Sequence, residues 1–199
     1  MIQFYHRNGF RLKGLFIRIF NLLFFPAKEW KNIAQENSSR KTVYRQFVAP
    51  LLCMMTIATI IGTWLATARE LYTLGYIICQ ILILWTSLSA GLYISAYFLT
   101  EIMAQQTGER NHNRDFALMA YSSGAAYLVI IIVALFPFFS ELYVLALYSC
   151  YLYWTGIPHI IRLESRERMS YALLSLIIMI VTYTLVLFLF DKILSSILL

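Results

Sequence analysis

The sequence predicts an all-α integral membrane protein, a bundle of five transmembrane helices preceded by a cytoplasmic amphipathic helix at the membrane interface. Five apolar segments each approach or exceed the roughly 20 residues that a helix needs to cross a bilayer. The chain is also 60% hydrophobic and only 13% charged, against about 25% charged residues in a typical soluble domain. Because lipid offers no partner for backbone polar groups, these segments must be helical. They cover residues 47–68, 75–104, 117–136, 142–161 and 171–190.

Residues 1–46 are expected to form cytoplasmic or interfacial helices, and residues 47–199 the five-span domain. Polar residues recur in steps of four and three along the first of these helices, which predicts one polar stripe on an otherwise apolar, aromatic helix. The stripe consists of Arg7, Arg11, Gly14, Arg18 and Asn21. Such a helix suits the membrane interface, with its arginines toward lipid phosphates. The alternative is a sixth helix packed against the bundle.

Local signals predict where the next helices begin and end. Pro26 lacks an N–H group, so it should end the first helix and start a short second one, with Trp30 at headgroup depth. The polar run 37–39 should break that helix and cap the next, which would begin around Arg40. The Tyr-Ser-Ser-Gly sequence at 121–124 predicts a kink in the third span, and Phe136-Pro137 precedes the fourth.

The basic residues predict the orientation of the chain. Of sixteen Lys and Arg residues, nine precede the first span, two follow the second and three follow the fourth, whereas only Arg69 and Lys192 lie in the remaining segments. The positive-inside rule therefore places the N-terminus in the cytoplasm and the C-terminus outside. This distribution connects the net charge of +6 with a membrane surface and not with nucleic acid.

Small residues at four-residue intervals predict helix-packing seams in the first two spans. Such rows let two backbones approach closely in lipid. We expect these spans to contact each other or a second copy of the chain, which would make it a homo-oligomer. The rows are Ala58, Gly62 and Ala66 in the first span, and Ser87, Gly91 and Ser95 in the second.

The polar residues do not predict an enzyme. No charged residue lies near the middle of a span, where it would indicate function, and Ser122 or Ser123 with His159 is the one nucleophile–base pairing that can be constructed. The three cysteines lack metal-ligand spacing, so no metal or cofactor is expected. Glu101 is the only acidic residue whose position allows partial burial, and a surface glutamate is favoured there over a buried carboxylate of a proton-coupled carrier. Residues 111–115 are expected to form a solvated turn, with loose metal coordination as the alternative.

Several short motifs, in order, resemble the Yip1 family of multi-span membrane proteins in its shorter bacterial form. They are Pro26-x-x-x-Trp30-x-x-Ile33, a polar loop leading through Asp115 to Tyr121-Ser122, Phe136-Pro137, and Tyr148 and Tyr151 before Gly156-Ile157-Pro158. The proline that often follows the Tyr-Ser pair is replaced by Ser123-Gly124-Ala125. The resemblance implies a five-helix bundle in a bacterial cytoplasmic (inner) membrane. Eukaryotic relatives bind prenylated Rab GTPases, a role not expected without such GTPases.

The function that follows is a non-enzymatic membrane scaffold that binds partner proteins or lipid at its cytoplasmic face. Its expected partners are the lipid bilayer, membrane proteins and a second copy of the chain. The candidate binding residues are Arg11, Arg18, Trp30, Tyr121 and Ser122. The alternative is a transporter of lipid or small molecules with a polar path near Gln80 and Ser122. A water-accessible cavity beside Gln80 would favour the transporter.

Overall fold

A computed structural model describes residues 12–66 and 74–161 continuously, and a series of shorter stretches between 169 and 192. The described part is helical, which confirms the all-α prediction there. Its elements are α1 (Leu12–Phe24), α2 (Pro26–Glu36), α3 (Arg40–Val43), the π-helix η2 (Tyr44–Val48), α4 (Ala49–Ala66), α5 (Leu74–Thr107), α6 (His112–Ser122), α7 (Gly124–Leu135), the 3₁₀ helix η3 (Pro137–Leu147) and α8 (Tyr148–Ile160).

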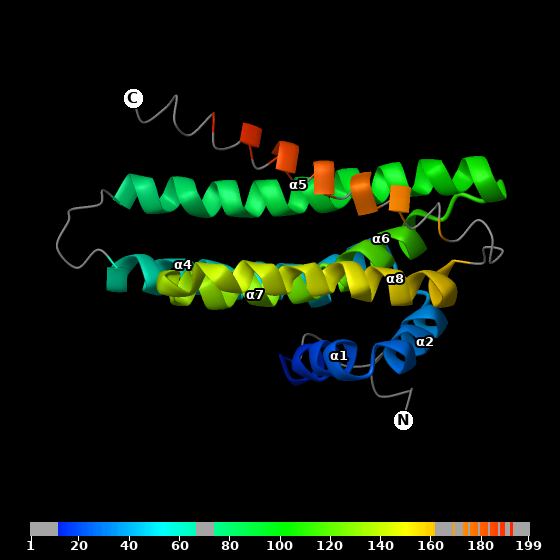
Figure 1. Cartoon of the computed structure of the whole chain (residues 1–199), viewed down its shortest axis with the longest axis horizontal. Coiled ribbons are helices and arrows are strands. Elements are labelled where there is room, and N and C mark those ends of the chain that lie inside the picture. The colour runs from blue at the N-terminus through cyan, green and yellow to red at the C-terminus, as the bar shows by residue number, and fades with distance from the viewer. Residues whose placement is uncertain are drawn as a thin grey trace.

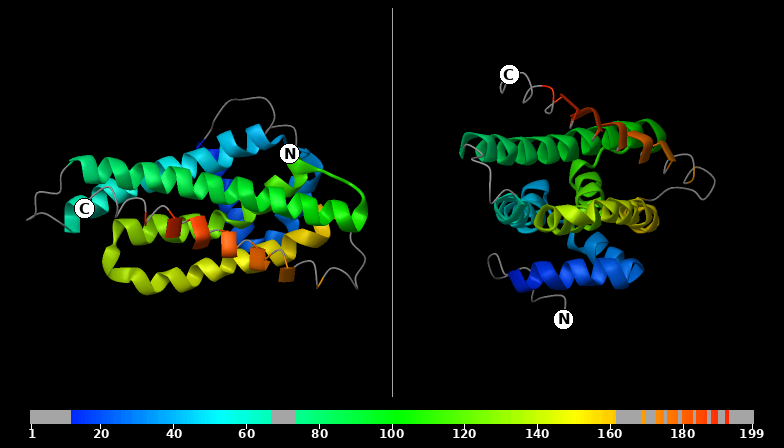
Figure 2. Two further views of the ribbon diagram at one scale, coloured as in Figure 1. Left: turned by 90° about the horizontal axis from the view of Figure 1, so that it is seen from above. Right: turned by 60° about the vertical axis from the view of Figure 1, so that its left-hand side comes forward.

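The helices form three layers, visible from two directions in Figures 1 and 2. The long α5 forms one outer layer, and α1 and α2 form the other. Between them lie α4, α7 and α8, with α6 reaching from this middle layer toward α5. The chain therefore builds its core around α6 and the middle layer.

The breaks between the N-terminal helices lie where the sequence predicts them. Phe25 leaves the helical conformation, and Pro26 is the first residue of α2. Asn37 ends α2 in the left-handed region, at φ 43°, a conformation that asparagine tolerates better than most residues. Ser39 caps the following helix by accepting a hydrogen bond from the Thr42 amide at 3.3 Å, so Arg40 begins α3.

Elements α3, η2 and α4 form one continuous rod whose wide π-helical turn lies just before Pro50. The Ala49 amide donates to the Tyr44 carbonyl, five residues back. Proline cannot donate to the residue four positions earlier and its ring crowds that carbonyl. The wider turn accommodates this missing bond without ending the rod.

Three helical segments among the described residues are long and apolar enough to cross a membrane: Arg40–Leu65, Ile77–Gln105 and His112–Leu135. They correspond to the first three expected spans. The third is divided at Ser123 between α6 and α7, as the sequence around Ser122 and Gly124 predicts. At about 1.5 Å per residue, the 34 residues of α5 extend about 51 Å, well beyond a hydrocarbon core of roughly 30 Å.

Among the described residues, the fourth and fifth expected spans contain no α-helix as long as the first three. Residues 142–161 are divided between the end of η3 and the 13-residue α8, and the helical segment begins earlier than expected, at Pro137. Within 171–190, Leu176–Val186 forms a shorter apolar helix, and several positions lie outside the described residues. The count of five spans therefore stays a prediction.

The first small-residue row packs against α7. A methyl group on Gly62 would overlap the carbonyl of Ala134, so the α4 backbone lies directly against α7. The first two spans do contact each other, as expected, but not through Gly62. The Trp85 indole donates a hydrogen bond to the Thr56 hydroxyl at 2.8 Å. Ala58 is buried in the core, and the side chain of Ala66 lies outside the described residues.

The second row lies on the buried side of α5. Ser87, Gly91 and Ser95 are all buried, and Ser95 retains only a negligible exposed surface. Because the main contact of α5 is with α6, this half of α5 belongs to the core. Whether either row also packs against a second copy stays a prediction.

Candidate functional site at the polar end of the bundle

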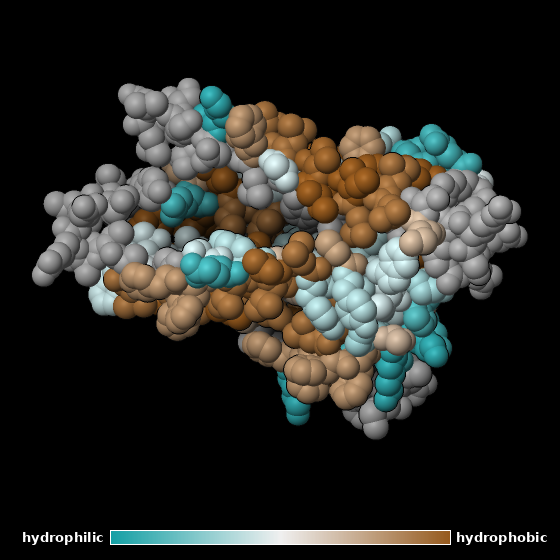
Figure 3. Space-filling view, viewed as in Figure 1, coloured by the Kyte–Doolittle hydropathy of each residue, from teal (hydrophilic) through white to brown (hydrophobic). Residues whose placement is uncertain are grey.

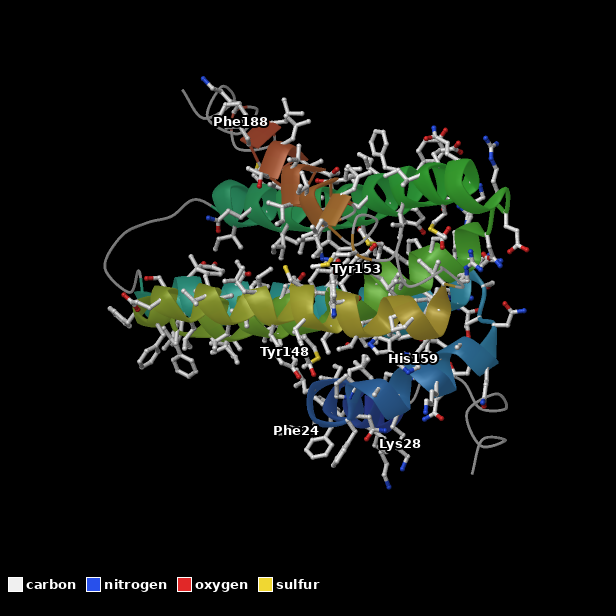
Figure 4. The ribbon with its side chains drawn as sticks, turned by 45° about the vertical axis from the view of Figure 1, so that its right-hand side comes forward. Phe24, Lys28, Tyr148, Tyr153, His159 and Phe188 are labelled. Atoms are coloured by element: carbon white, nitrogen blue, oxygen red, sulfur yellow. The ribbon has the colours of Figure 1, made fainter. Side chains whose placement is uncertain are left out.

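Helix α1 turns its polar stripe toward α2 and its aromatic residues outward. Arg18 is 3% exposed, and Leu15 and Ile19 are buried beside it. The outward face carries the exposed residues Phe16, Ile17, Phe20, Phe24 and Phe25. Figure 4 shows Phe24 and Lys28 pointing away from the middle layer. The geometry is that of a helix packed on the bundle, while placement at the membrane interface stays a prediction.

Two glutamates from α2 hold Arg18 in this buried position. Arg18 Nε lies 3.2 Å from Glu29 Oε1, and Arg18 Nη2 donates a hydrogen bond to Glu36 Oε1. The other oxygen of Glu29 accepts hydrogen bonds from the amides of Asn21 at 3.1 Å and Asn32 at 3.2 Å. A buried charge is tolerated only when it is paired and hydrogen-bonded, so this network ties α1 to α2.

An aromatic cluster joins this N-terminal layer to the core. The Arg18 guanidinium lies over the Tyr121 ring, 5.3 Å from its centroid, which is a cation–π geometry. The Trp30 and Phe47 rings meet Tyr121 edge-on, with centroids 6.5 and 4.7 Å away. Residues from α1, α2, η2 and α6 therefore converge on one tyrosine.

A glycine in α8 makes room for Trp30. A Cβ atom on Gly156 would lie 2.7 Å from Trp30 Cε2, far inside van der Waals contact. Trp30 itself is fully buried. Trp30 and Gly156 belong to different sequence motifs, and their direct contact joins α2 to α8.

Four of the five candidate binding residues are brought together by the structure, and all four are buried. Arg18, Trp30 and Tyr121 share the aromatic cluster, and Ser122 follows at 0% exposure. Arg11 lies outside the described residues. Their role in binding partners or lipid stays a prediction. The sequence could not show that Arg18, Trp30 and Tyr121 pack against one another.

The polar sequence expected to be a solvated turn is the first turn of α6. Asn111 caps the helix by accepting from the Arg114 amide at 3.1 Å. Asn113 Oδ1 accepts from the Arg40 amide at 3.1 Å and so links α6 to the first rod. The solvated-turn expectation was therefore wrong for this segment.

The expectation that no acidic residue other than Glu101 could be buried was also wrong. Asp115 is fully buried and Glu29 is 5% exposed, whereas the Glu101 side chain is 30% exposed and pairs with Arg110. Asp115 Oδ1 lies 3.6 Å from Arg114 Nε, too far for a good hydrogen bond. Asp115 lies next to an apolar helical run, a position from which burial could have been suspected.

A pocket of about 460 Å³ opens beside Arg114, where α2, α6 and α8 end or begin. We call this region the polar end of the bundle. Its polar lining comes from Asn37, Ser38, Glu109, Asn113, Arg114 and His159. Figure 3 shows hydrophilic surface gathered toward this end and a largely hydrophobic surface between the ends. Sequence reasoning pointed to the charged loop but missed Asn37, Ser38 and His159 as its neighbours.

The side chains of the serine–histidine pairing bond their own helices. Ser123 Oγ donates to the Met119 carbonyl at 2.9 Å, and His159 Nδ1 lies 3.0 Å from the Thr155 carbonyl. Within the described residues, no group of three or more His, Cys, Asp or Glu side chains is arranged to hold a metal ion.

The family model of the Yip1 domain matches residues 20–186. This match confirms the resemblance carried by Pro26, Trp30, Asp115, Tyr121 and the later motifs. No curated protein and no solved structure is significantly similar to the chain. With apolar helices long enough to cross a bilayer and a family match over most of its length, the chain belongs to the Yip1 family of membrane proteins.

Proposed function

We propose that this protein is a non-enzymatic membrane scaffold that binds partner proteins or lipid at the polar end of its bundle. The observation that carries this proposal is the pocket beside Arg114, where amide, hydroxyl, imidazole and charged groups gather. Elsewhere the chain exposes large apolar side chains, including Ile78, Leu82 and Leu145, which suit contact with lipid. The groups suited to binding a polar ligand therefore gather at the polar end of the bundle.

The transporter alternative receives less support from the positions of Gln80 and Ser122. Phe116 of α6 packs against Tyr93 of α5, with ring centroids 4.9 Å apart. Ser122 lies six residues beyond Phe116 along α6, a rise of about 9 Å from this contact. Gln80 lies thirteen residues from Tyr93 along α5, a rise of about 20 Å. Gln80 therefore lies about 11 Å beyond Ser122 along the bundle, so the two polar groups do not share one site and a path between them would need further polar groups.

We also propose that the polar end faces the cytoplasm of a bacterial cell and that the protein lies in the inner membrane. The basic residues before the first span and after the second support this orientation. The test uses cysteine variants in a chain whose three native cysteines are replaced by serine. Glu109→Cys should react with a membrane-impermeant maleimide only after the membrane is opened, and Glu141→Cys should react in intact cells. The reverse pattern would overturn the orientation.

Site-specific photo-crosslinking in native membranes tests the scaffold function. A photoreactive residue at Lys41 or Glu109, both exposed near the polar end, should give reproducible crosslinks to protein or lipid identified by mass spectrometry. The matched control is Phe138, 87% exposed and remote in sequence from the polar end, which should crosslink only to lipid. Identical products at all three positions would contradict a dedicated binding face.

A further inference from the structure

We propose that the pocket at the polar end binds a zwitterionic phosphoethanolamine group, a phosphate ester with a primary ammonium two carbons away. This inference rests on the proposed function and specifies its ligand. The pocket volume of about 460 Å³ lies within the usual range for small-molecule sites. Figure 4 shows His159, one of its lining residues, at the end of α8 above the α2 layer.

Arg114 is the group that would bind the phosphate. Its side chain is 18% exposed, and its two ion pairs, to Asp115 at 3.6 Å and Glu109 at 4.0 Å, are both longer than a hydrogen bond. A guanidinium has five N–H donors, so Arg114 retains donors for phosphate oxygens. Its planar fork matches phosphate geometry. Asp115 is fully buried behind it, with Oδ1 3.6 Å from Arg114 Nε, and acts as a positioning residue that limits where the guanidinium can lie.

The sign of the neighbouring charges distinguishes between headgroups. Glu109 stands at the rim with a side chain 77% exposed, 4.0 Å from the Arg114 guanidinium. A purely anionic headgroup, such as phosphoglycerol, would gain from Arg114 but be repelled by Glu109. A zwitterion places its phosphate on Arg114 and its ammonium on Glu109, so both contacts are favourable.

The polar lining also distinguishes a primary ammonium from a trimethylammonium. Asn37, Ser38 and Asn113 supply oxygen acceptors around the pocket. His159 Nδ1 lies 3.0 Å from the Thr155 carbonyl, which holds the imidazole ring in place beside these acceptors. A primary ammonium has three N–H donors for such groups, whereas choline has none. We therefore expect phosphoethanolamine to bind better than phosphocholine.

The floor of the pocket is apolar, which fits the glycerol end of a lipid better than a free solute. Ile33 and Ile160 line it at 5% and 7% exposure, and Met103 lines it fully buried. These apolar surroundings suit the hydrocarbon part of a lipid better than the remaining hydroxyls of a free headgroup. A phospholipid and a soluble phosphoethanolamine ester share the same recognition chemistry, and the experiment must distinguish them.

The experiment is native mass spectrometry of the purified full chain with equal amounts of phosphatidylethanolamine, phosphatidylglycerol and phosphatidylcholine of identical acyl chains. The wild-type chain should retain phosphatidylethanolamine at least about fivefold over the other two, the order expected from one hydrogen bond of ordinary net strength. Competition by soluble glycerophosphoethanolamine would support the proposal with the free ester as ligand. Retention without such competition would support the intact lipid.

The decisive variant is Glu109→Gln, because this exposed side chain can lose its charge without disturbing the core. It should lower the ratio of bound phosphatidylethanolamine to phosphatidylglycerol about fivefold. The matched control Glu141→Gln, also exposed, should leave the ratio unchanged. Equal retention of the three lipids by the wild-type chain, or an unchanged ratio in Glu109→Gln, would overturn the inference. Crosslinks to a partner protein at residue 109 alongside equal lipid retention would overturn it while leaving the scaffold function intact.

Discussion

Two membrane-length segments of this bundle have similar hydropathy, but one lies in the protein core and the other largely at the surface. In the most apolar 18-residue stretch of His112–Leu135, which α6 and α7 form, the mean hydropathy is 2.1 and 67% of the residues are buried, whereas in that of Ile77–Gln105 in α5 the mean hydropathy is 1.9 and only 22% are buried. Between 77 and 86, every described side chain of α5 is half-buried or exposed. Hydropathy therefore predicts that a helix enters the membrane but does not predict whether lipid or protein surrounds it there.

The difference lies in where small and polar residues meet a partner. Gly62 of α4 packs against Ala134 of the segment His112–Leu135, which we call the central segment. Gly124 of the central segment lies against the Phe47 ring. The first half of α5 has few such contacts, and its partner α6 lies against its second half. A close approach needs small residues on one helix and a facing helix at the same height.

The largest effect is expected at the closest backbone approach to the central segment. Gly62→Leu should destabilise the fold by more than about 3 kcal/mol, because the side chain would meet the Ala134 carbonyl and no rotamer can avoid a backbone atom. Size-exclusion chromatography in detergent should show loss of the monodisperse species. The control Ile61→Phe changes a neighbouring exposed residue and should behave as wild type. Equal behaviour of both variants would mean that α4 does not contact α7 at this point.

A second large effect is expected at Arg18, which joins α1 to α2 and lies over the Tyr121 ring of α6. Arg18→Met should cost about 3–5 kcal/mol, because Glu29 and Glu36 would lose the cation that balances them. Thermal unfolding followed by tryptophan fluorescence measures this loss. Adding Glu29→Gln and Glu36→Gln should recover much of the stability, since no uncompensated charge remains. A single variant as stable as wild type would contradict a buried ion pair.

A smaller effect is expected at the contact between α2 and α8. Gly156→Ala should cost about 1–3 kcal/mol, because the new methyl group would displace the Trp30 indole. The double variant with Trp30→Phe should lose less than the sum of the two single changes, since the smaller ring leaves room for the methyl group. Thermal denaturation of the four chains measures this coupling. Strict additivity would show that the two residues do not touch.

The smallest effect is expected on the first half of α5 and tests the comparison directly. Leu82→Ala, at a side chain 58% exposed, should change the free energy of unfolding by less than about 0.5 kcal/mol. Leu118→Ala, at a fully buried position in α6, should cost about 2–5 kcal/mol. Comparable losses at both positions would place a second copy of the chain against α5, and analytical ultracentrifugation in detergent would then detect a dimer.

The amino-acid sequence by itself determined the class of the protein and most of its helix boundaries. The apolar lengths, the break at Pro26, the cap at Ser39 and the division near Ser123 depend on hydrogen bonds within a few residues. The 3₁₀ conformation of η3 was not predicted, since a terminal proline indicates where a helix starts but not how tightly it winds. The polar loop around Arg114 was visible in the sequence, but not the helix ends that complete its pocket.

Only the tertiary structure decided which surfaces face protein. Arg18 could face lipid phosphates or an internal partner, and Glu29 and Glu36 hold it inside. The Gly62 row could have met α5, and it meets α7. Asp115 was expected in a solvated turn, and it is buried behind Arg114. In each case the side chain suits two environments by its own chemistry, and a neighbour distant in sequence determines which environment it occupies.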